Sequence, residues 1–150
     1  GRDFKLNYFV SRNYYDGGMK YKNPPASRNN IIFENLISWK YPVVLVEGIF
    51  DAIALRRNCI PLLGKLLSDK LKQALVETKP PMVYVMLDKD AQKESLQIEN
   101  YLKSVNVNTK LVVPTNKDAS DMGFEQSWIN INNAVSSNFT DLIGTKLKMV

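Results

Sequence analysis

The feature that most constrains the fold is an alternation of short apolar runs with segments of helical periodicity, beginning near position 41. The runs rich in β-branched residues are PVVLVE at 42–47, MVYVMLD at 82–88 and NTKLVVP at 108–114, and CIPLLG at 59–64 could add a short strand. The segments 49–58, 67–77 and 92–104 carry apolar residues at helical spacing. Strands separated by helices predict an α/β fold whose mainly parallel sheet is flanked by helices.

The helix over 67–77 has the clearest local signals. Ser68 is a favourable N-cap, and Leu71, Leu75 and Val76 are expected to face the core. A last helical region is predicted from about Met122 onward. The terminal stretch TDLIGTKLKMV at 140–150 predicts a peripheral helix with a basic face.

The first 40 residues differ in composition from the rest of the chain. They are rich in Tyr, Asn, Gly, Pro and basic residues, and a hairpin turn is predicted at Asp16, Gly17 and Gly18. We therefore predict three parts: a small basic β-rich subdomain over 1–40, the α/β domain over 41–124, and a helical extension over 125–150.

Composition excludes several kinds of site. The 150 residues include one cysteine, Cys59, and no histidine, so an internal disulfide and a zinc finger are both excluded. Any metal must then be a hard cation held by oxygen. The formal charge of +5 makes an acidic partner such as nucleic acid plausible. No apolar run approaches the ~20 residues of a membrane span and no leader pattern opens the chain, so a cytoplasmic protein is expected.

Acidic residues follow the predicted strands where a parallel sheet gathers its functional groups. Glu47 and Asp88 each end a strand, and Asp118 follows a third. Asp90 would share a face with Asp88 if the segment were extended. Because the carboxyl ends of parallel strands lie at one edge of the sheet, we expect these carboxylates to converge. They supply the oxygen ligands that Mg²⁺ prefers.

Each acid also has a structural interpretation. Asp51 stands in the first turn of a predicted helix, where the helix dipole favours a carboxylate. Either Asp88 or Asp90 could cap the following helix. The four tyrosines at 8, 14, 15 and 21 could stack on bases or could form the core of the small subdomain with Phe4, Phe9 and Phe33. Trp39 and Trp128 are interpreted as packing residues.

The acidic pattern resembles a known domain. Glu47-Gly48 followed by Asp51, the pair Asp88-x-Asp90, and KDASD at 117–121 are similar to the metal-binding signature of the Toprim domain, a Rossmann-like α/β domain. This domain is shared by bacterial-type primases, topoisomerases of types IA and II, OLD-family nucleases and RecR-like proteins. The resemblance implies metal ligands at Glu47, Asp88 and Asp90, with Asp51, Asp118 and Asp121 completing the cluster.

Within that group the chain is most similar to the catalytic core of bacterial and phage (DnaG-like) DNA primases. FVSRNYYDGGMKYKNPPAS at 9–27, IIFENLISW at 31–39 and IPLLGKLLSDKL at 60–71 match primase segments, and the similarity spans 8–123. It implies nucleic-acid or nucleotide binding by Arg12, Lys20, Lys22 and Asn23. Lys65 follows a glycine in a predicted loop, where it could contact a phosphate or could simply be a solvated lysine. The chain departs from the primase pattern in three places. Lys65 stands where many primases have a small hydroxyl residue, and Gln92 replaces a glycine. In Asp118-Ala119-Ser120-Asp121, the second acid is shifted by one position.

The resemblance implies a function. Such a core is a nucleotidyltransferase that uses Mg²⁺ (or Mn²⁺), ribonucleoside triphosphates and a single-stranded DNA template to make RNA primers. Its catalytic residues would be Glu47, Asp88 and Asp90, and a replicative helicase would be reached through regions outside this core. The chain is expected to be a core fragment of a phage-type or divergent primase. A Toprim nuclease or topoisomerase fragment and a non-catalytic RecR-like DNA-binding module remain alternatives.

Overall fold

The central element of the chain is a four-stranded, all-parallel sheet, as predicted. A computed structural model describes residues 6, 8–15, 17–19, 21–25 and 27–134. The strands are β3 (Val43–Val46), β4 (Cys59–Pro61), β5 (Val83–Met86) and β6 (Thr109–Leu111), in the spatial order β4-β3-β5-β6. The two central strands, β3 and β5, pair in register, with the last residue of β3 opposite the last residue of β5. Both strands therefore end at the same level of the sheet.

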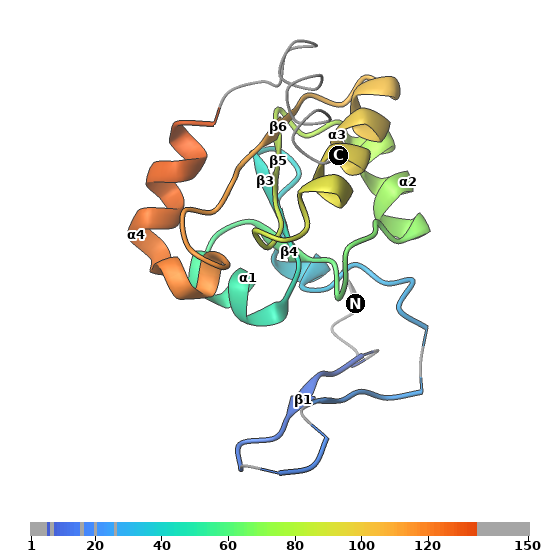
Figure 1. Ribbon diagram of the computed structural model, residues 1–150. Helices are drawn as coiled ribbons and strands as arrows, with labels where there is room; N and C mark the ends of the chain where they lie inside the picture. Colours follow the sequence, from blue (N-terminus) through green and yellow to red (C-terminus); the bar gives the residue numbers. More distant parts are fainter. Residues whose placement is uncertain (1–5, 7, 16, 20, 26, 135–150) are drawn as a thin grey trace.

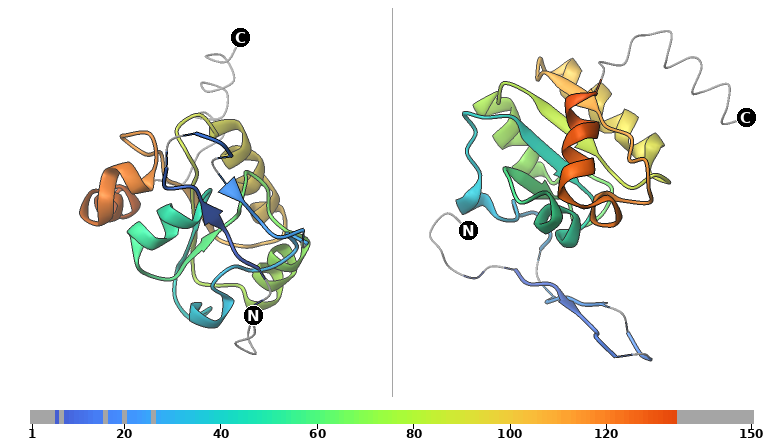
Figure 2. Two further views of the ribbon diagram at one scale, coloured as in Figure 1. Left: turned by 90° about the horizontal axis from the view of Figure 1, so that it is seen from below. Right: turned by 90° about the vertical axis from the view of Figure 1, so that its left-hand side faces the viewer.

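Helices cover both faces of this sheet, which makes a three-layer α/β/α domain (Figures 1 and 2). α2 (Asp69–Thr78) and α3 (Gln92–Ser104) pack on one face, and α1 (Ile49–Leu55) and α4 (Ala119–Asn132) pack on the other. No helix in the described part of the chain is long and apolar enough to span a membrane.

Strand β3 shows why the sheet needs two helical layers. All four of its residues are buried, and successive side chains point to opposite faces. Val43 and Leu45 pack in the core beneath α2 and α3, whereas Val44 and Val46 pack beneath α1 and α4. Each such side chain contributes roughly 1.5–3 kcal/mol by burial. The continuous apolar run is thus the sequence signature of a strand covered on both faces.

The predicted cap of α2 is confirmed. The Ser68 hydroxyl accepts a hydrogen bond from the Leu71 N–H at 3.2 Å. Leu71 and Leu75 are buried against the sheet, and Val76 is half-buried. Local sequence therefore determined both where this helix begins and which side faces inward.

Helix α4 begins earlier than the predicted helical region. It starts at Ala119 rather than near Met122, because the Asp118 side chain caps it by accepting a hydrogen bond from the Asp121 N–H at 2.8 Å. Gly123, with φ 72°, interrupts the helical geometry. A second helical segment continues from this kink through position 125 to Asn132, and the predicted division of the chain at 124/125 stays a prediction. The Trp128 indole N–H donates to the Leu55 carbonyl at 3.3 Å, which ties α4 to the end of α1 and agrees with a packing role.

The amino-terminal region forms a hairpin that projects from the α/β body (Figure 1). β1 (Ser11–Arg12) pairs antiparallel with β2 (Tyr21–Lys22), and a short 3₁₀ helix, η1 (Glu34–Leu36), precedes the sheet. Gly17 and Gly18 have φ values of 102° and 85°, which side-chain-bearing residues rarely adopt. The predicted turn is therefore confirmed at these two positions, while Asp16 and the predicted helix at 140–150 lie outside the described residues.

Candidate active site

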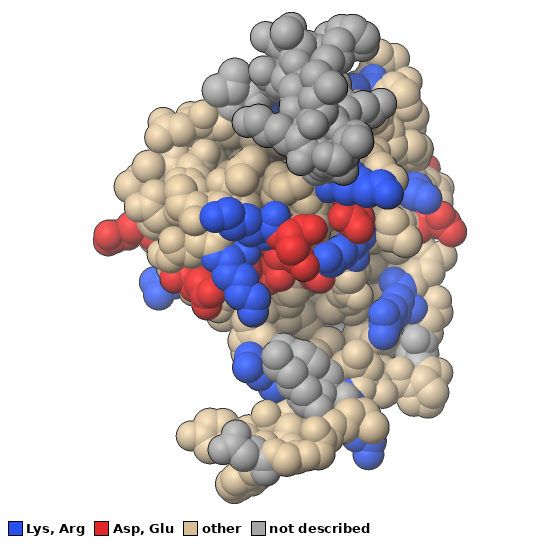
Figure 3. Space-filling model, in the orientation of Figure 1, with Lys and Arg blue, Asp and Glu red and all other residues tan. Residues whose placement is uncertain are grey.

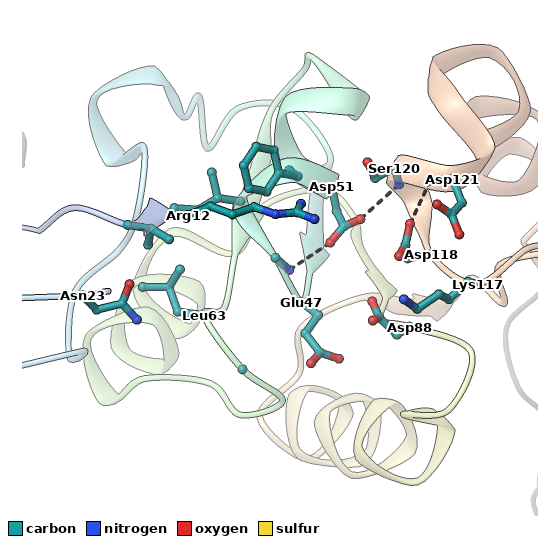
Figure 4. A pocket seen from close by; sticks show the side chains of 15 residues that line it. Arg12, Asn23, Glu47, Asp51, Leu63, Asp88, Lys117, Asp118, Ser120 and Asp121 are labelled. Atoms are coloured by element: carbon teal, nitrogen blue, oxygen red, sulfur yellow. Dashed lines mark hydrogen bonds between the residues drawn. The ribbon is translucent and has the colours of Figure 1, made fainter. Parts of the chain in front are cut away.

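A concave feature lies at the carboxyl ends of β3 and β5. It is a cavity of about 550 Å³, bounded by the hairpin on one side and by the start of α4 on the other (Figure 4). We call it the acidic pocket. Its charged and polar lining residues are Arg12, Asn23, Glu47, Asp51, Asp88, Lys117, Asp118, Ser120 and Asp121. In the space-filling view, carboxylates gather on this face of the α/β body and are bordered by basic side chains (Figure 3).

Glu47 and Asp88 form the centre of the acidic pocket. Because β3 and β5 are parallel and in register, the residues that follow them leave the sheet side by side. The two carboxylates point toward each other (Figure 4). Glu47 Oε2 is buried and accepts no hydrogen bond from any described residue. A buried carboxylate oxygen without a donor is unfavourable unless something else neutralises it.

The electrostatics of this pair favour a bound cation. Burial raises the pKa of Glu47; the nearby charge of Lys65 lowers it, and the charges of Asp90, Asp51 and Glu94 raise it. Burial, followed by the charges of Glu47 and Asp51, raises the pKa of Asp88 to about 6. Both shifts arise because negative charges are crowded in a partly desolvated site, and a cation there would reverse them.

Asp51 has a different role from Glu47 and Asp88. It is buried, and both of its oxygens are engaged by backbone: Oδ2 accepts from the Gly48 N–H at 3.0 Å, and Oδ1 accepts from the Ser120 N–H at 3.0 Å. Burial raises its pKa, the bond from Ser120 lowers it, and the charge of Asp118 raises it again. Asp51 therefore joins the start of α1 to the start of α4 and shapes one wall of the acidic pocket.

Asp90 does not share a face with Asp88, so the expectation of an extended Asp-x-Asp segment is wrong. Strand β5 ends at Met86, positions 89 and 90 lie in a turn, and the Ala91 N–H donates to the Asp88 carbonyl at 2.9 Å. Asp90 is not among the residues that line the acidic pocket, although its charge raises the pKa of both Glu47 and Asp88. Its exposed carboxylate instead lies 3.4 Å from the Lys65 ammonium.

The fold of the chain is similar to the folds of solved primase structures. The chain is similar to the zinc-binding and RNA polymerase domains of the Aquifex aeolicus primase, with a TM-score of 0.73 and 25% identity over 96% of this chain. The chain has the fold of a DnaG-like primase domain. The same fold occurs in the primase fragment of the bacteriophage T7 primase-helicase, with a TM-score of 0.61 and 15% identity over 89% of this chain.

Sequence comparison adds one relative of this primase-like chain. An uncharacterized protein of Mycoplasma pneumoniae is 32% identical over 97 residues, which cover 61% of this chain and 46% of the relative. No protein-family profile matches the chain. The chain spans about half of that relative, 40% of the Aquifex chain and 59% of the T7 chain.

Only some of the residues predicted to bind nucleotide in this primase-like fold line the acidic pocket. Arg12 and Asn23 line the acidic pocket, and the Arg12 guanidinium lies over the ring of Phe50 at 5.3 Å. Lys22 is exposed on β2 and does not line the acidic pocket. Lys20 lies outside the described residues. The hairpin thus brings part of the basic amino-terminal segment to the carboxylates that follow the sheet.

The tyrosines separate into the two predicted roles. Tyr8 is 9% exposed, in agreement with the core interpretation. A separate core of the small subdomain is nevertheless wrong for Phe9, which is 48% exposed, and for Phe33, which packs against the core beneath α1 and α4; Phe4 lies outside the described residues. Tyr14 and Tyr15 are 94% and 81% exposed, and their rings meet edge to face at 5.8 Å. The side chain of Tyr21 lies outside the described residues. Base stacking therefore stays a prediction for Tyr14 and Tyr15.

Lys117 is a candidate that sequence reasoning missed. Its side chain lines the acidic pocket and ends beside Asp88 (Figure 4). The backbone places it there, because the Lys89 N–H donates to the Lys117 carbonyl at 2.9 Å and joins the turn after β5 to the loop after β6. Lys89 itself points to that loop, where its ammonium lies 3.5 Å from the Thr115 carbonyl. The signal in the sequence was the position of Lys117 directly before Asp118.

The carboxylates at the centre of the acidic pocket fit a hard divalent cation. Among the described residues, no group of three or more Cys, Asp or Glu side chains is close enough to form a complete protein cage. The orphaned Glu47 oxygen and the facing Asp88 nevertheless provide the all-oxygen donor set that Mg²⁺ or Mn²⁺ accepts. Mg²⁺ in particular is bound through one or two carboxylates and keeps several waters.

Proposed function

We propose that the chain is the catalytic core of a DNA primase, a nucleotidyltransferase that synthesises short RNA primers on single-stranded DNA with Mg²⁺ or Mn²⁺. The observation that carries this proposal is the facing pair of Glu47 and Asp88 after adjacent parallel strands. One Glu47 oxygen of this pair is buried and has no hydrogen-bond partner among the described residues. The primase-type fold and the basic hairpin beside the pair support the same function.

In the proposed reaction, the oxygen of the primer 3′ hydroxyl attacks the α-phosphorus of a ribonucleoside triphosphate and gives up its proton to solvent. The new P–O bond forms as the bond between the α-phosphorus and the bridging α–β oxygen breaks, and pyrophosphate leaves. Glu47 and Asp88 hold the divalent cation, and Asp90, Asp118 and Asp121 complete the acidic surroundings. When bound, the cation polarises phosphate oxygens and orients the attacking and leaving groups. Asp51 keeps α1 and α4 in position so that the carboxylates stay fixed.

Basic residues around the pocket bind the substrate phosphates in this proposal. Arg12 offers a planar fork of N–H donors suited to phosphate, and stacking on Phe50 limits its orientations. Lys117 supplies a point charge on the opposite side of the cavity, and Asn23 adds an amide between hairpin and pocket. The triphosphate would thus lie between the hairpin and the start of α4.

The hairpin provides the template track in this proposal. Lys22 is exposed there, and Tyr14 and Tyr15 present open aromatic faces. Phosphate attraction combined with aromatic stacking suits single-stranded nucleic acid. Lys20 belongs to the same proposed track. The proposal also includes a replicative helicase as a partner, bound through other parts of a longer protein. The expected location is the cytoplasm, which is that of the host cell if the protein is phage-encoded.

Primer synthesis on single-stranded DNA tests this function. The 150-residue chain would be incubated with labelled ribonucleoside triphosphates and Mg²⁺ or Mn²⁺, beside Glu47→Gln and Asp88→Asn. Both substitutions preserve shape and remove a charge that would hold the cation, so each should reduce product formation by about 100-fold or more. Glu125→Gln is the matched control, because Glu125 is exposed on α4 and outside the acidic pocket, and it should retain wild-type activity.

Two outcomes would overturn the proposal. Metal-dependent nicking of DNA that is lost in Glu47→Gln and Asp88→Asn, without RNA products, would assign the chain to Toprim nucleases or topoisomerases. DNA binding by the wild-type chain, with neither activity, would indicate a RecR-like binding module.

A further inference from the structure

Lys65 brings a positive charge to the edge of the acidic pocket. It follows Gly64, whose φ of 146° turns the chain directly after the loop that leaves β4. Because β4 is the neighbour of β3 in the sheet, this loop lies beside the segment that carries Glu47. The Lys65 ammonium is 3.4 Å from Asp90 Oδ2 and forms a hydrogen-bonded ion pair with it.

Three carboxylates act on this lysine. Partial burial lowers the pKa of Lys65, but the charges of Glu47, Asp90 and Glu94 and the hydrogen bond to Asp90 outweigh burial, so that the pKa is raised. Conversely, the charge of Lys65 lowers the pKa of Glu47. Lys65 is thus a counter-ion for Glu47 and Asp90 together, although its hydrogen bond goes to Asp90 alone.

The pair contributes little to folding. The Lys65 side chain is 33% exposed and the Asp90 side chain is 80% exposed. Ion pairs with that exposure typically contribute little to the free energy of unfolding, because solvent screens them. The charge of Lys65 therefore matters mainly for what else binds at this edge, and the residue can be changed without unfolding the chain.

We propose that Lys65 is a tethered cation that takes the place of one divalent ion between Glu47 and Asp90, and so restricts metal uptake at this edge of the acidic pocket. The inference rests on the proposed function, since it concerns the same carboxylates. An ammonium offsets one negative charge and donates hydrogen bonds, but it cannot accept a phosphate oxygen into a coordination shell. Metal binding then centres on Glu47 and Asp88.

Titration with Mn²⁺ alone tests this inference without any assay of activity. Free Mn²⁺ would be followed by electron paramagnetic resonance at fixed ionic strength for the wild-type chain, Lys65→Gln and Lys65→Arg. The neutral Lys65→Gln should bind an additional Mn²⁺ or bind it roughly 3- to 10-fold more tightly, because one repelling charge is removed near the ion. Lys65→Arg keeps the charge and should match the wild-type chain.

The chain offers a closely matched control. Lys72 pairs with Asp69 at 3.3 Å on α2, with side-chain exposures of 39% and 84%, outside the acidic pocket. Lys72→Gln makes the same change in net charge, so it should leave Mn²⁺ binding as in the wild-type chain. Adding Asp90→Asn to Lys65→Gln should abolish the gain, which assigns it to this edge.

Two outcomes overturn the inference. In the first, Lys65→Gln binds Mn²⁺ no better than Lys72→Gln does. In the second, neither the wild-type chain nor Lys65→Gln binds Mn²⁺. Thermal unfolding without metal, expected to be the same for all variants within about 2 °C, shows that they are folded. Primer synthesis by the wild-type chain is a separate readout. If primers are made but Lys65→Gln gains no Mn²⁺, the role of Lys65 is wrong and the proposed function stands.

Discussion

Asp51 and Ser120, 69 positions apart in the sequence, are joined by a hydrogen bond of 3.0 Å from the Ser120 N–H to Asp51 Oδ1. The other carboxylate oxygen accepts from the Gly48 N–H, so one buried side chain organises the starts of both helices on one face of the sheet. The walls of the acidic pocket depend on this arrangement.

We predict that Asp51→Ala lowers the free energy of unfolding by about 2–3 kcal/mol, because two partly buried N–H groups lose their acceptor. Urea unfolding at neutral pH measures the change. Asp121→Ala is the control, since Asp121 is exposed and at the same end of α4, and it should change stability by less than about 0.5 kcal/mol. Wild-type stability in Asp51→Ala, accompanied by loss of Mn²⁺ binding, would instead identify Asp51 as a metal ligand.

The raised pKa of Asp88 predicts a pH dependence of stability. Its pKa is about 6 in the folded chain and 3.8 as the unperturbed value, so the folded state binds the proton more tightly than the unfolded state. Below pH 3.8 the group has no effect; the metal-free fold loses stability as pH rises from 3.8 through the folded pKa of about 6, above which the loss is complete. Asp88→Asn should therefore raise the Tm by about 2–4 °C near pH 7.5, a value that allows for solvent screening of this partly exposed group. Below pH ~4 the same substitution should leave the Tm unchanged.

Thermal scans with a chelator over that pH range provide the measurement. Asp69→Asn, at an exposed position on α2, should show no gain. Adding Mg²⁺ should stabilise the wild-type chain more than Asp88→Asn, because an ion that binds the folded state stabilises it in proportion to its affinity. An Asp88→Asn variant that is less stable than the wild-type chain near pH 7.5 would contradict the crowding of charge described above.

Arg12 provides a prediction for nucleotide binding. Arg12→Ala removes the phosphate-binding fork stacked over Phe50 and should weaken binding of a ribonucleoside triphosphate about 10-fold, as measured by fluorescence anisotropy. Arg28→Ala is the control, because Arg28 is an exposed arginine that lies outside the acidic pocket. Equal losses in the two variants would show that the effect of Arg12 is only that of net charge.

The cap of α2 yields a prediction about stability. Ser68→Ala leaves the Leu71 N–H without its side-chain acceptor and should lower the free energy of unfolding by about 1 kcal/mol. Ser104→Ala, at the exposed end of α3, should have a smaller effect. Chemical denaturation of the two variants compares them directly, and an Ser104→Ala variant as unstable as Ser68→Ala would contradict a specific role for the cap.

Part of the candidate site followed from the sequence because strand direction and register are simple. The apolar run ending before Glu47 and the run ending before Asp88 predicted two buried parallel strands, and any such strands bring their following residues to one edge. The convergence of these two carboxylates therefore required no knowledge of loops. The same reasoning failed for Asp90, because it assumed that the strand continued past Met86.

What the sequence by itself determined was the layered parallel sheet, the cap at Ser68, the glycine turn of the hairpin and the meeting of Glu47 with Asp88. Only the tertiary structure decided that Asp90 pairs with Lys65, that Asp51 accepts from Ser120, and that Lys117 enters the cavity. The physical reason is range. Periodicity and capping act over a few neighbouring residues, whereas these contacts join loops that are distant in the sequence. Backbone hydrogen bonds set the paths of those loops, and side-chain patterns do not encode them.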